Sequence, residues 1–211
     1  MLNIHELFTS LQGESSHAGR RCFFIRLAGC RLDCSYCDTR HADSGTPMSI
    51  EALLQAARDA ECKLVEITGG EPLEQAETPL LAQQLIEAGF EVLIETNGSC
   101  DISAVPPPAV RIVDCKLPGS GMEKHNLWSN FSGISTRDEV KFVVSDRADF
   151  DYAINVIKQY QLENKCGILF SPIWGKVRFD DLAQWILETR APGRMQIQMH
   201  KIIWGADAKG V

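Results

Sequence analysis

The sequence has 211 residues, which fits one domain or at most two small ones. Its net charge of −7, from 21 Lys and Arg against 28 Asp and Glu, argues against broad nucleic-acid binding. No run of 18 apolar residues predicts a membrane span, and the first residues do not resemble a secretory signal. We therefore expect one cytoplasmic domain over residues 1–211, with its scattered cysteines reduced.

The first predicted strand, at residues 22–29, leads into a loop with three closely spaced cysteines, Cys30, Cys34 and Cys37. A [4Fe-4S] cluster normally takes four cysteine ligands, so three leave one iron free to bind a group that is not protein. His41 offers an alternative fourth ligand, because three cysteines and one histidine also form a closed tetrahedral zinc site. The loop indicates either an open iron-sulfur cluster or structural zinc.

Strand and helix patterns alternate along the rest of the chain. We expect Pro47 and Ser49 to begin the first helix, with Ser49 as its N-cap. The further predicted elements are, in chain order, a strand at 63–70, a helix at 78–89, strands at 90–96, 110–116 and 139–145, a helix with Phe150, Ile154 and Ile157 on its core face, a strand at 166–172, a helix with Leu182, Trp185, Ile186 and Thr189 on one face, and a last strand at 194–200.

This alternation predicts an α/β fold with a mainly parallel sheet and right-handed crossovers. The chain is short for a closed barrel of eight β/α units, so we expect an incomplete TIM-type barrel with about six parallel core strands. Functional residues of such folds lie at the carboxyl ends of the strands. Here those ends are the cysteine loop and the segments 68–71, 95–97, 114–116, 171–172 and 199–201.

The second strand end, Thr68-Gly69-Gly70-Glu71, has two interpretations. A Gly-Gly pair is common in tight turns. It also exposes backbone to a ligand, and Glu71 then offers a carboxylate to an ammonium group. A three-cysteine loop after one strand and a Gly-Gly-Glu turn after the next together resemble the radical S-adenosylmethionine (SAM) superfamily. The resemblance implies that SAM chelates the open iron while the glycine segment holds its amino end.

Within that superfamily the sequence resembles the 7-carboxy-7-deazaguanine synthase family over nearly its whole length. The resemblance rests on ELFTSLQGE at 6–14, FIRLAGC at 24–30, CDT at 37–39, TGGEP at 68–72, IETNGS at 94–99 and QMHK at 198–201. It implies a radical SAM lyase that contracts 6-carboxy-5,6,7,8-tetrahydropterin to 7-carboxy-7-deazaguanine with loss of ammonia, in queuosine biosynthesis, a tRNA modification pathway. The implied cofactors are a [4Fe-4S] cluster, SAM and Mg2+.

The resemblance also implies roles for particular residues. The expected cluster ligands are Cys30, Cys34 and Cys37, and the expected Mg2+ ligand is Thr39. Without the resemblance, the Thr39 hydroxyl would be interpreted as part of a turn or a cap. No side chain is expected to act as a catalytic group, because SAM carries the radical. The expected substrate-binding residues are Leu11, Gln12, Gly13, Glu14, Arg26, Thr68 and His200. The expected SAM-binding residues are Tyr36, Cys37, Asp38, Gly70, Glu71, Asp114, Cys115, Lys116, Ser171, Pro172, Ile173 and Trp174.

Three of these residues also have a plainer interpretation. An Arg fork suits the planar carboxylate of the substrate, but Arg26 on a strand equally predicts a salt bridge to Glu14 or another carboxylate. Glu14 either binds the pterin's amino groups or caps a turn. A lone histidine at a strand end, such as His200, is usually structural. The tail after Lys201 has no assigned role.

The resemblance further implies a homodimer, a small pterin substrate and a reductase such as flavodoxin as electron donor, with no nucleic-acid or membrane partner. Two alternatives remain open. A radical SAM enzyme that activates a glycyl-radical partner protein would share the cysteines and the Gly-Gly-Glu turn, although residues 11–14 and Arg26 favour the synthase. A zinc-binding module would use the same cysteines with His41.

Overall fold

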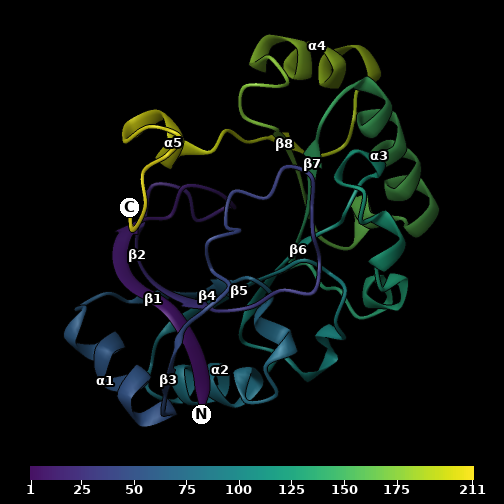
Figure 1. Ribbon diagram of the computed structural model, residues 1–211. Coiled ribbons are helices and arrows are strands. Elements are labelled where there is room, and N and C mark those ends of the chain that lie inside the picture. Colours follow the sequence, from purple (N-terminus) through teal and green to yellow (C-terminus); the bar gives the residue numbers. More distant parts are fainter.

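The computed structural model describes residues 1–211 and has one nine-stranded sheet as its frame, in the order β3-β1-β2-β4-β5-β6-β7-β8-β9 (Figure 1). Neighbouring strands from β2 to β9 run parallel, whereas β1 is antiparallel to both β2 and β3. The strands are β1 (Leu2–Leu11), β2 (Arg21–Leu27), β3 (Thr46–Met48), β4 (Leu64–Gly69), β5 (Glu91–Thr96), β6 (Val110–Asp114), β7 (Glu139–Val144), β8 (Gly167–Pro172) and β9 (Arg194–Met195). The sheet does not close, which confirms the expected incomplete barrel.

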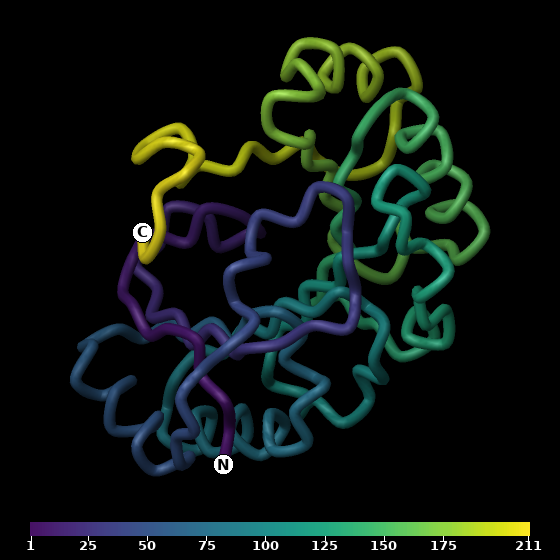
Figure 2. The backbone as a smooth tube through the Cα atoms, viewed as in Figure 1, coloured from purple at the N-terminus to yellow at the C-terminus, as the bar shows by residue number.

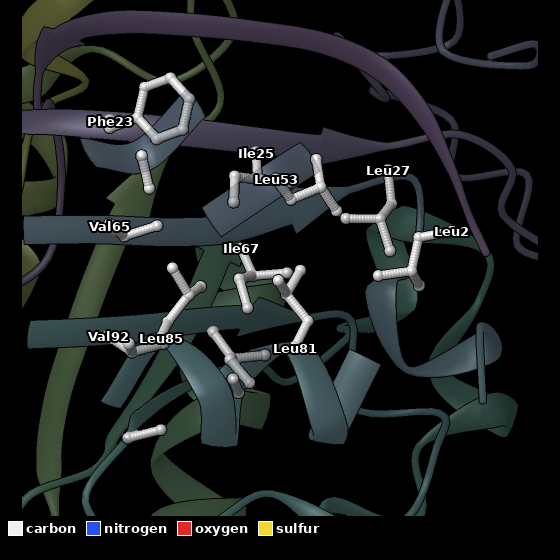
Figure 3. Packing of buried hydrophobic residues seen from close by; sticks show 14 of the residues in the cluster. Leu2, Phe23, Ile25, Leu27, Leu53, Val65, Ile67, Leu81, Leu85 and Val92 are labelled. Atoms are coloured by element: carbon white, nitrogen blue, oxygen red, sulfur yellow. The ribbon is translucent and has the colours of Figure 1, made fainter. Parts of the chain in front are cut away.

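Two helices cover the outer face of the first parallel strands. The apolar sides of α1 (Ile50–Asp59) and α2 (Thr78–Glu87) pack on β2, β4 and β5. Ser49 caps α1 as expected, because its side chain accepts a hydrogen bond from the Ala52 amide at 3.2 Å. Figure 3 shows the resulting core, in which strand residues meet helix residues, among them Phe23, Ile25, Leu27, Val65, Ile67, Leu53, Leu81 and Leu85.

A second core holds the other half of the sheet. The helices α3 (Arg147–Tyr160) and α4 (Phe179–Thr189) pack on β6, β7 and β8. Phe150, Ile157 and Leu182, which the sequence placed in the core, have no exposed surface. The sheet is curved, and α1 to α4 all lie on its outer side (Figure 1). These helices therefore leave the inner face of the sheet open.

The inner face has an apolar base and a polar upper layer. Side chains of a strand alternate between its two faces, so residues two positions apart point the same way. At the base, Cys22, Leu64, Leu93 and Ile112 pack together. Further along the same strands the inward positions are polar and border a cavity, among them Arg26, Glu66, Thr68, Glu95 and Asp114. The fold thus seals the bottom of the barrel and leaves its carboxyl side open for chemistry.

Three expectations about the elements are wrong. Residues 2–11, to which the sequence patterns assigned no structure, form β1. Pro47 does not begin a helix but lies in β3, and α1 begins at Ile50. The last strand does not reach His200: it ends at Met195, and beyond it the Gln196 and Gln198 side-chain amides each donate to the Glu14 carboxylate at 2.9 Å. His200 lies instead in the short helix α5 (Met199–Ile203).

The C-terminal tail lies against the N-terminal strand beside the open side of the barrel. In Figure 2 the C-terminal segment descends from α5 to the N-terminal strand. A Cβ at Gly210 would lie 3.9 Å from the Glu6 carboxylate oxygen Oε2, which places the tail against β1. None of the helices combines the length and the apolar character needed to cross a membrane.

Candidate functional site

A cavity of about 850 Å³ lies on the inner face, at the carboxyl ends of the parallel strands. Because parallel strands end on the same side of a sheet, residues far apart in the sequence meet there. The cavity collects residues from the cysteine loop and from the expected strand ends at 68–71, 95–97, 114–116 and 199–201. The expected end at 171–172 does not line the cavity, but Ile173 and Trp174, which follow it, do. This convergence makes it the candidate site.

Cys30, Cys34 and Cys37 line this cavity, and no other cysteine of the chain does. Cys30 and Cys37 are exposed, whereas Cys34 is buried. Short turns shape the loop, since the Cys37 amide donates to the Cys34 carbonyl at 3.2 Å and the Ala42 amide to the Thr39 carbonyl at 2.9 Å. Three thiols that face one cavity without a fourth fit a [4Fe-4S] cluster with one open iron.

His41 does not complete the cysteine set. In a tetrahedral zinc site the ligand atoms lie within about 4 Å of one another, because Zn–S is about 2.3 Å and Zn–N about 2.0 Å. The histidines, cysteines and acidic residues of the chain contain one group of three or more ligand atoms that all lie within 4.8 Å of one another, formed by His5, Glu6 and His41. The geometry therefore does not support the closed zinc site of three cysteines and His41.

A buried polar wall lies beside the cysteines. Lys116 Nζ lies 2.9 Å from Asp114 Oδ2 and 5.9 Å from the ring centre of Tyr36. Burial alone would lower the pKa of Lys116, but the Asp114 carboxylate outweighs it and raises the pKa above its ordinary value. Asp114 Oδ1 and the Tyr36 hydroxyl are buried without a hydrogen-bond partner. Since buried polar atoms are normally paired, these two atoms fit the polar groups of a bound molecule such as SAM.

Gly69 and Gly70 bring the second strand end against the cysteine loop. A Cβ at Gly70 would lie 1.9 Å from the Gly29 carbonyl oxygen, and Gly69 has a φ of 149°, which favours glycine. The Glu71 amide donates to the same Gly29 carbonyl at 2.8 Å. The glycine pair therefore lets two backbone segments of the site approach each other closely.

Glu71 itself does not line the cavity, and its expected contact with SAM stays a prediction. Its side chain has no exposed surface, and its carboxylate accepts hydrogen bonds from the Leu73 amide at 3.0 Å, the Thr96 hydroxyl at 2.8 Å and the Asn97 amide at 2.6 Å. Burial raises the pKa of Glu71 to about 7. The carboxyl group therefore joins the end of β4 to the end of β5 and positions the backbone there.

Cys115, Ser171 and Pro172 also lie outside the cavity lining, contrary to expectation. Cys115 packs in the second apolar core, and Ser171 is buried in β8. Residues next to one another in an extended chain point in opposite directions, so Asp114 and Lys116, the two neighbours of Cys115, face the cavity instead. Ile173 and Trp174, which follow the end of β8, also line the cavity, and all four are expected as SAM contacts.

The buried Lys141 and the half-buried Glu14 and Glu95 form a charge cluster on the cavity floor. The Lys141 ammonium lies 3.0 Å from Glu14 Oε2 and also pairs with Glu95. Burial alone would raise the pKa of Glu14, but Lys141 and the Gln198 amide outweigh it and hold the pKa below its usual value. Glu14 Oε2 accepts from Lys141 and Gln196, whereas Oε1 accepts from Gln198 alone. One acceptor position on Oε1 therefore remains for a ligand.

Glu66 adds a further buried carboxyl group to the floor. The Gln12 side-chain amide donates to this carboxyl group. Burial and the neighbouring Glu95 carboxylate raise the pKa of Glu66 well above its usual value, which favours the protonated form. In that form a carboxyl group donates as well as accepts. Donors and acceptors thus lie close together, which suits the edge of a planar heterocycle.

Arg26 and two phenylalanines form the wall contributed by β1 and β2. The Phe8 and Phe24 rings stack with their centres 4.8 Å apart, and the Arg26 guanidinium lies 5.6 Å from the centre of the Phe8 ring. Arg26 Nε donates to Glu6 Oε1 at 2.7 Å, so the salt bridge considered for Arg26 is present, with Glu6 as partner. The Nε bond leaves the two terminal nitrogens of Arg26 for the carboxylate of a ligand.

Residues 11–14 and α5 close one side of the cavity. The Met199 amide donates to the Gly13 carbonyl at 3.1 Å, and a Cβ at Gly13 would lie 2.5 Å from His200 Nδ1. The structure brings the whole expected substrate set into one lining, while its contact with a substrate stays a prediction. That set is Leu11, Gln12, Gly13, Glu14, Arg26, Thr68 and His200.

Thr39 and Asp38 place two oxygen-bearing side chains at the same cavity. The Thr39 hydroxyl donates to Asp38 Oδ1 at 3.0 Å, and Lys201 Nζ donates to Asp38 Oδ2 at 2.8 Å. This chain of contacts ties the cysteine loop to α5. Oxygen ligands suit Mg2+, which keeps several waters and needs few protein groups.

Several lining residues were missed from the sequence. Glu66 and Lys141 occupy inward strand positions, and a signal existed: each is a charged residue inside an otherwise apolar run. Phe8 was missed because β1 was not predicted. The tail residues 208–211 also line the cavity, and only the fold brings them there.

Comparisons with known proteins agree on one relationship. The model of the radical SAM superfamily matches residues 24–106. A 7-carboxy-7-deazaguanine synthase of Chlorobaculum tepidum is 43% identical over 214 residues, covering 100% of this chain and 97% of the relative. Another, of Koribacter versatilis, is 39% identical and covers 100% of both chains. The crystal structure of QueE from Escherichia coli matches with a TM-score of 0.77 at 26% identity and covers 94% of each chain.

Proposed function

The chain belongs to the 7-carboxy-7-deazaguanine synthase family of radical SAM enzymes, and we propose that it catalyses the ring contraction of 6-carboxy-5,6,7,8-tetrahydropterin. The product is 7-carboxy-7-deazaguanine, and ammonia is lost. The enzyme is then a carbon-nitrogen lyase of the 7-deazapurine and queuosine pathway.

The observation that carries this proposal is that the three-cysteine loop and the polar floor open into one cavity. A substrate on the floor therefore shares its enclosure with a cofactor held by the loop. Such an enclosure positions reactants and keeps water from reactive intermediates. The charged groups lie deep, on the floor, which suits a small polar molecule better than a loop of a partner protein.

The floor and its walls are matched to a carboxypterin. Glu14 Oε1 accepts a hydrogen bond from the exocyclic amino group, and Gln12 and the Glu66 carboxyl group contact the neighbouring polar edge. The free nitrogens of Arg26 bind the substrate carboxylate as a fork. Leu11, Gly13, Thr68 and His200 border the rest of the ring.

Cys30, Cys34 and Cys37 hold the [4Fe-4S] cluster, which with SAM supplies the one-electron reduction that begins hydrogen abstraction from the substrate. The orphaned Asp114 Oδ1 accepts from a hydroxyl or ammonium group of SAM, and the Tyr36 hydroxyl is a second polar contact. Thr39 would contribute its hydroxyl to Mg2+, an ion that keeps several waters and needs few protein ligands. The remaining SAM wall consists of Asp38, Gly70, Lys116, Ile173 and Trp174.

The setting of the enzyme follows from the same chemistry. We propose that residues 1–211 act as one radical SAM domain, in the cytoplasm, where exposed iron-sulfur ligands stay reduced. A reductase such as flavodoxin supplies the electron, and the enzyme is a homodimer. Analytical ultracentrifugation of the cluster-loaded protein checks the dimer.

Anaerobic turnover tests the proposal. The cluster-loaded enzyme is mixed with SAM, dithionite, Mg2+ and 6-carboxy-5,6,7,8-tetrahydropterin, and mass spectrometry follows the deazaguanine product. We expect product with the native chain and none with Cys37→Ser. Cleavage of SAM while the tetrahydropterin remains unchanged would contradict the proposed substrate. Parallel reactions with Thr39→Val, with and without Mg2+, test the metal assignment, because only the native enzyme should respond to Mg2+.

A further inference from the structure

A second cluster of side chains has the composition of a metal site. His5, Glu6 and His41 place their ligand atoms within 4.8 Å of one another. The two imidazole rings meet edge to face with their centres 5.2 Å apart. His5 and Glu6 belong to β1, whereas His41 follows the cysteine loop, so two segments distant in the sequence build the cluster. Glu6 and His41 border the cavity. Glu6 lies in β1, near one end of the strand order, whereas Lys141 lies in β7, near the other end.

An irregularity of β1 creates this cluster. In a regular strand, consecutive residues point to opposite faces, which would separate His5 from Glu6. Ile4 pairs with Leu27 and Glu6 pairs with Arg26, so β1 contains one extra residue, His5, relative to β2. A bulge of this kind re-aims side chains and is common beside functional sites. It brings two consecutive ligand-type residues to the same point.

Hydrogen bonds orient two of the three residues for metal binding. His5 Nδ1 lies 2.9 Å from the Ser44 carbonyl oxygen, which only accepts, so Nδ1 carries the proton and Nε2 keeps its lone pair. Metal-binding histidines are commonly held in this way by a backbone carbonyl. Glu6 uses Oε1 for Arg26, and its other oxygen, Oε2, remains available.

We propose that His5, Glu6 and His41 bind a divalent ion of the zinc type, at a site separate from the cysteines and from Thr39. Two imidazoles and one carboxylate favour Zn2+ or Co2+ over Mg2+, and three protein ligands leave a position open for water or another group. Zn–N bonds of about 2.0 Å set ligand atoms about 3.4 Å apart, so ligand atoms that lie within 4.8 Å of one another draw together by at most about 1.4 Å on binding. His41 is exposed and free to make this movement.

The ion connects the edge of the sheet to the cysteine loop. It joins β1 to the segment that carries Thr39, while the Glu6 Oε1 bond to Arg26 stays in place. The positive charges of Arg26 and Lys209 act on His41, so they weaken the binding of a cation. We therefore expect micromolar rather than nanomolar affinity for zinc.

Equilibrium dialysis of the cluster-loaded enzyme against micromolar zinc tests the site, with iron and zinc measured by mass spectrometry. We expect one zinc ion per chain beyond a full iron content. His5→Ala and His41→Ala should lose the zinc and keep the iron, and Glu6→Gln should weaken zinc binding at least roughly tenfold. His125→Ala, which removes a histidine outside the cavity lining, is the matched control and should keep both metals.

X-ray absorption at the zinc edge separates this site from the cysteines. The proposed ligands give nitrogen and oxygen neighbours near about 2.0 Å and no sulfur near about 2.3 Å. Zinc that persists in both histidine variants, zinc that enters only as iron is lost, or a sulfur shell around zinc would each overturn the proposal. The readouts do not depend on turnover, so they stand apart from the test of the ring contraction.

Discussion

The cavity floor and the cysteine loop are held in different ways. On the floor, the buried Lys141 ammonium pairs with the half-buried Glu14 and Glu95 carboxylates. The loop exposes Cys30 and Cys37, and beyond its own turns it is attached by contacts such as that of the Ser35 hydroxyl with the Gly119 carbonyl at 2.8 Å. Ion pairs between the protein's own side chains are set in place when the chain folds. A metal-binding loop gains much of its order from the metal.

This difference assigns separate tasks to the two regions. The floor provides substrate recognition as part of the folded protein, and its side chains contribute to stability. The loop provides chemistry and contributes little to stability until the cluster is bound. A substitution on the floor should therefore lower the stability of the cluster-free protein. A substitution of a cluster cysteine should instead abolish turnover and leave that stability nearly unchanged.

The largest expected effect on turnover is that of Cys37→Ser. The variant should lose the cluster and all product formation, while the unfolding free energy of its cluster-free form changes by no more than about 0.5 kcal/mol. Iron analysis, turnover and urea unfolding measure the three quantities. Cys100→Ser, which alters a cysteine outside the cavity lining, should retain iron and activity. A large loss of stability in cluster-free Cys37→Ser would show that the loop supports the fold.

The largest expected effect on stability is that of Lys141→Met. Removing the ammonium leaves the Glu14 and Glu95 carboxylates without their common partner, and breaking a buried pair costs about 3–5 kcal/mol. Urea unfolding of the cluster-free protein measures the change. Lys176→Met, at an exposed lysine, serves as the control and should stay close to the native value. Equal urea midpoints for the two variants would contradict a structural role for the floor.

A pH effect of intermediate size is expected from Glu14. Its folded pKa lies below the ordinary value of 4.5, so the folded state favours the charged form. The resulting stability is present above the unfolded pKa and is lost as pH falls through the folded pKa. In a background without the three cluster cysteines, Glu14→Gln should lose less stability between pH 6 and about 3 than its parent. Parallel slopes in urea unfolding at these pH values would contradict the assignment.

The smallest expected effect is that of Gly13→Ala. The new methyl group would overlap His200 Nδ1, which forces a repacking of roughly 1 kcal/mol at the edge of the substrate site. KM for the tetrahydropterin should rise about fivefold, with a smaller change in kcat. Gly133→Ala, where the nearest atom to a Cβ is 3.8 Å away, is the control. An unchanged KM would mean that the Gly13 edge does not contact the substrate.

Much of the fold could be predicted because local patterns and packing agree. The alternation of strands and helices, the Ser49 cap and the core positions of α3 and α4 follow from short-range rules. The strand β1 could not be predicted in this way, since His5, Glu6 and Ser10 interrupt any clear alternation of apolar residues. The end of the last strand could not be predicted for a different reason. The Gln196 and Gln198 side chains donate to Glu14, a residue far away in the sequence.

The site shows the same limit. Residues in recognisable motifs were placed correctly at the cavity where their side chains point inward, as for Tyr36, Asp114 and Lys116. Motif membership does not give side-chain direction, so Glu71 and Cys115 were assigned to the cavity although they are buried elsewhere. Lys141 belongs to no motif, and its role depends on pairing across strands that only the fold brings together.

Hydrogen-deuterium exchange of the cluster-free and the cluster-loaded enzyme tests the central contrast most directly. Peptides from residues 28–45 should exchange quickly without the cluster and slow down on loading. Peptides from β4, β5 and β7, which carry the floor residues Glu66, Glu95 and Lys141, should exchange at the same rate in both forms. Floor strands that become protected only on cluster loading would contradict the account, because the substrate site would then depend on the cluster rather than on the fold.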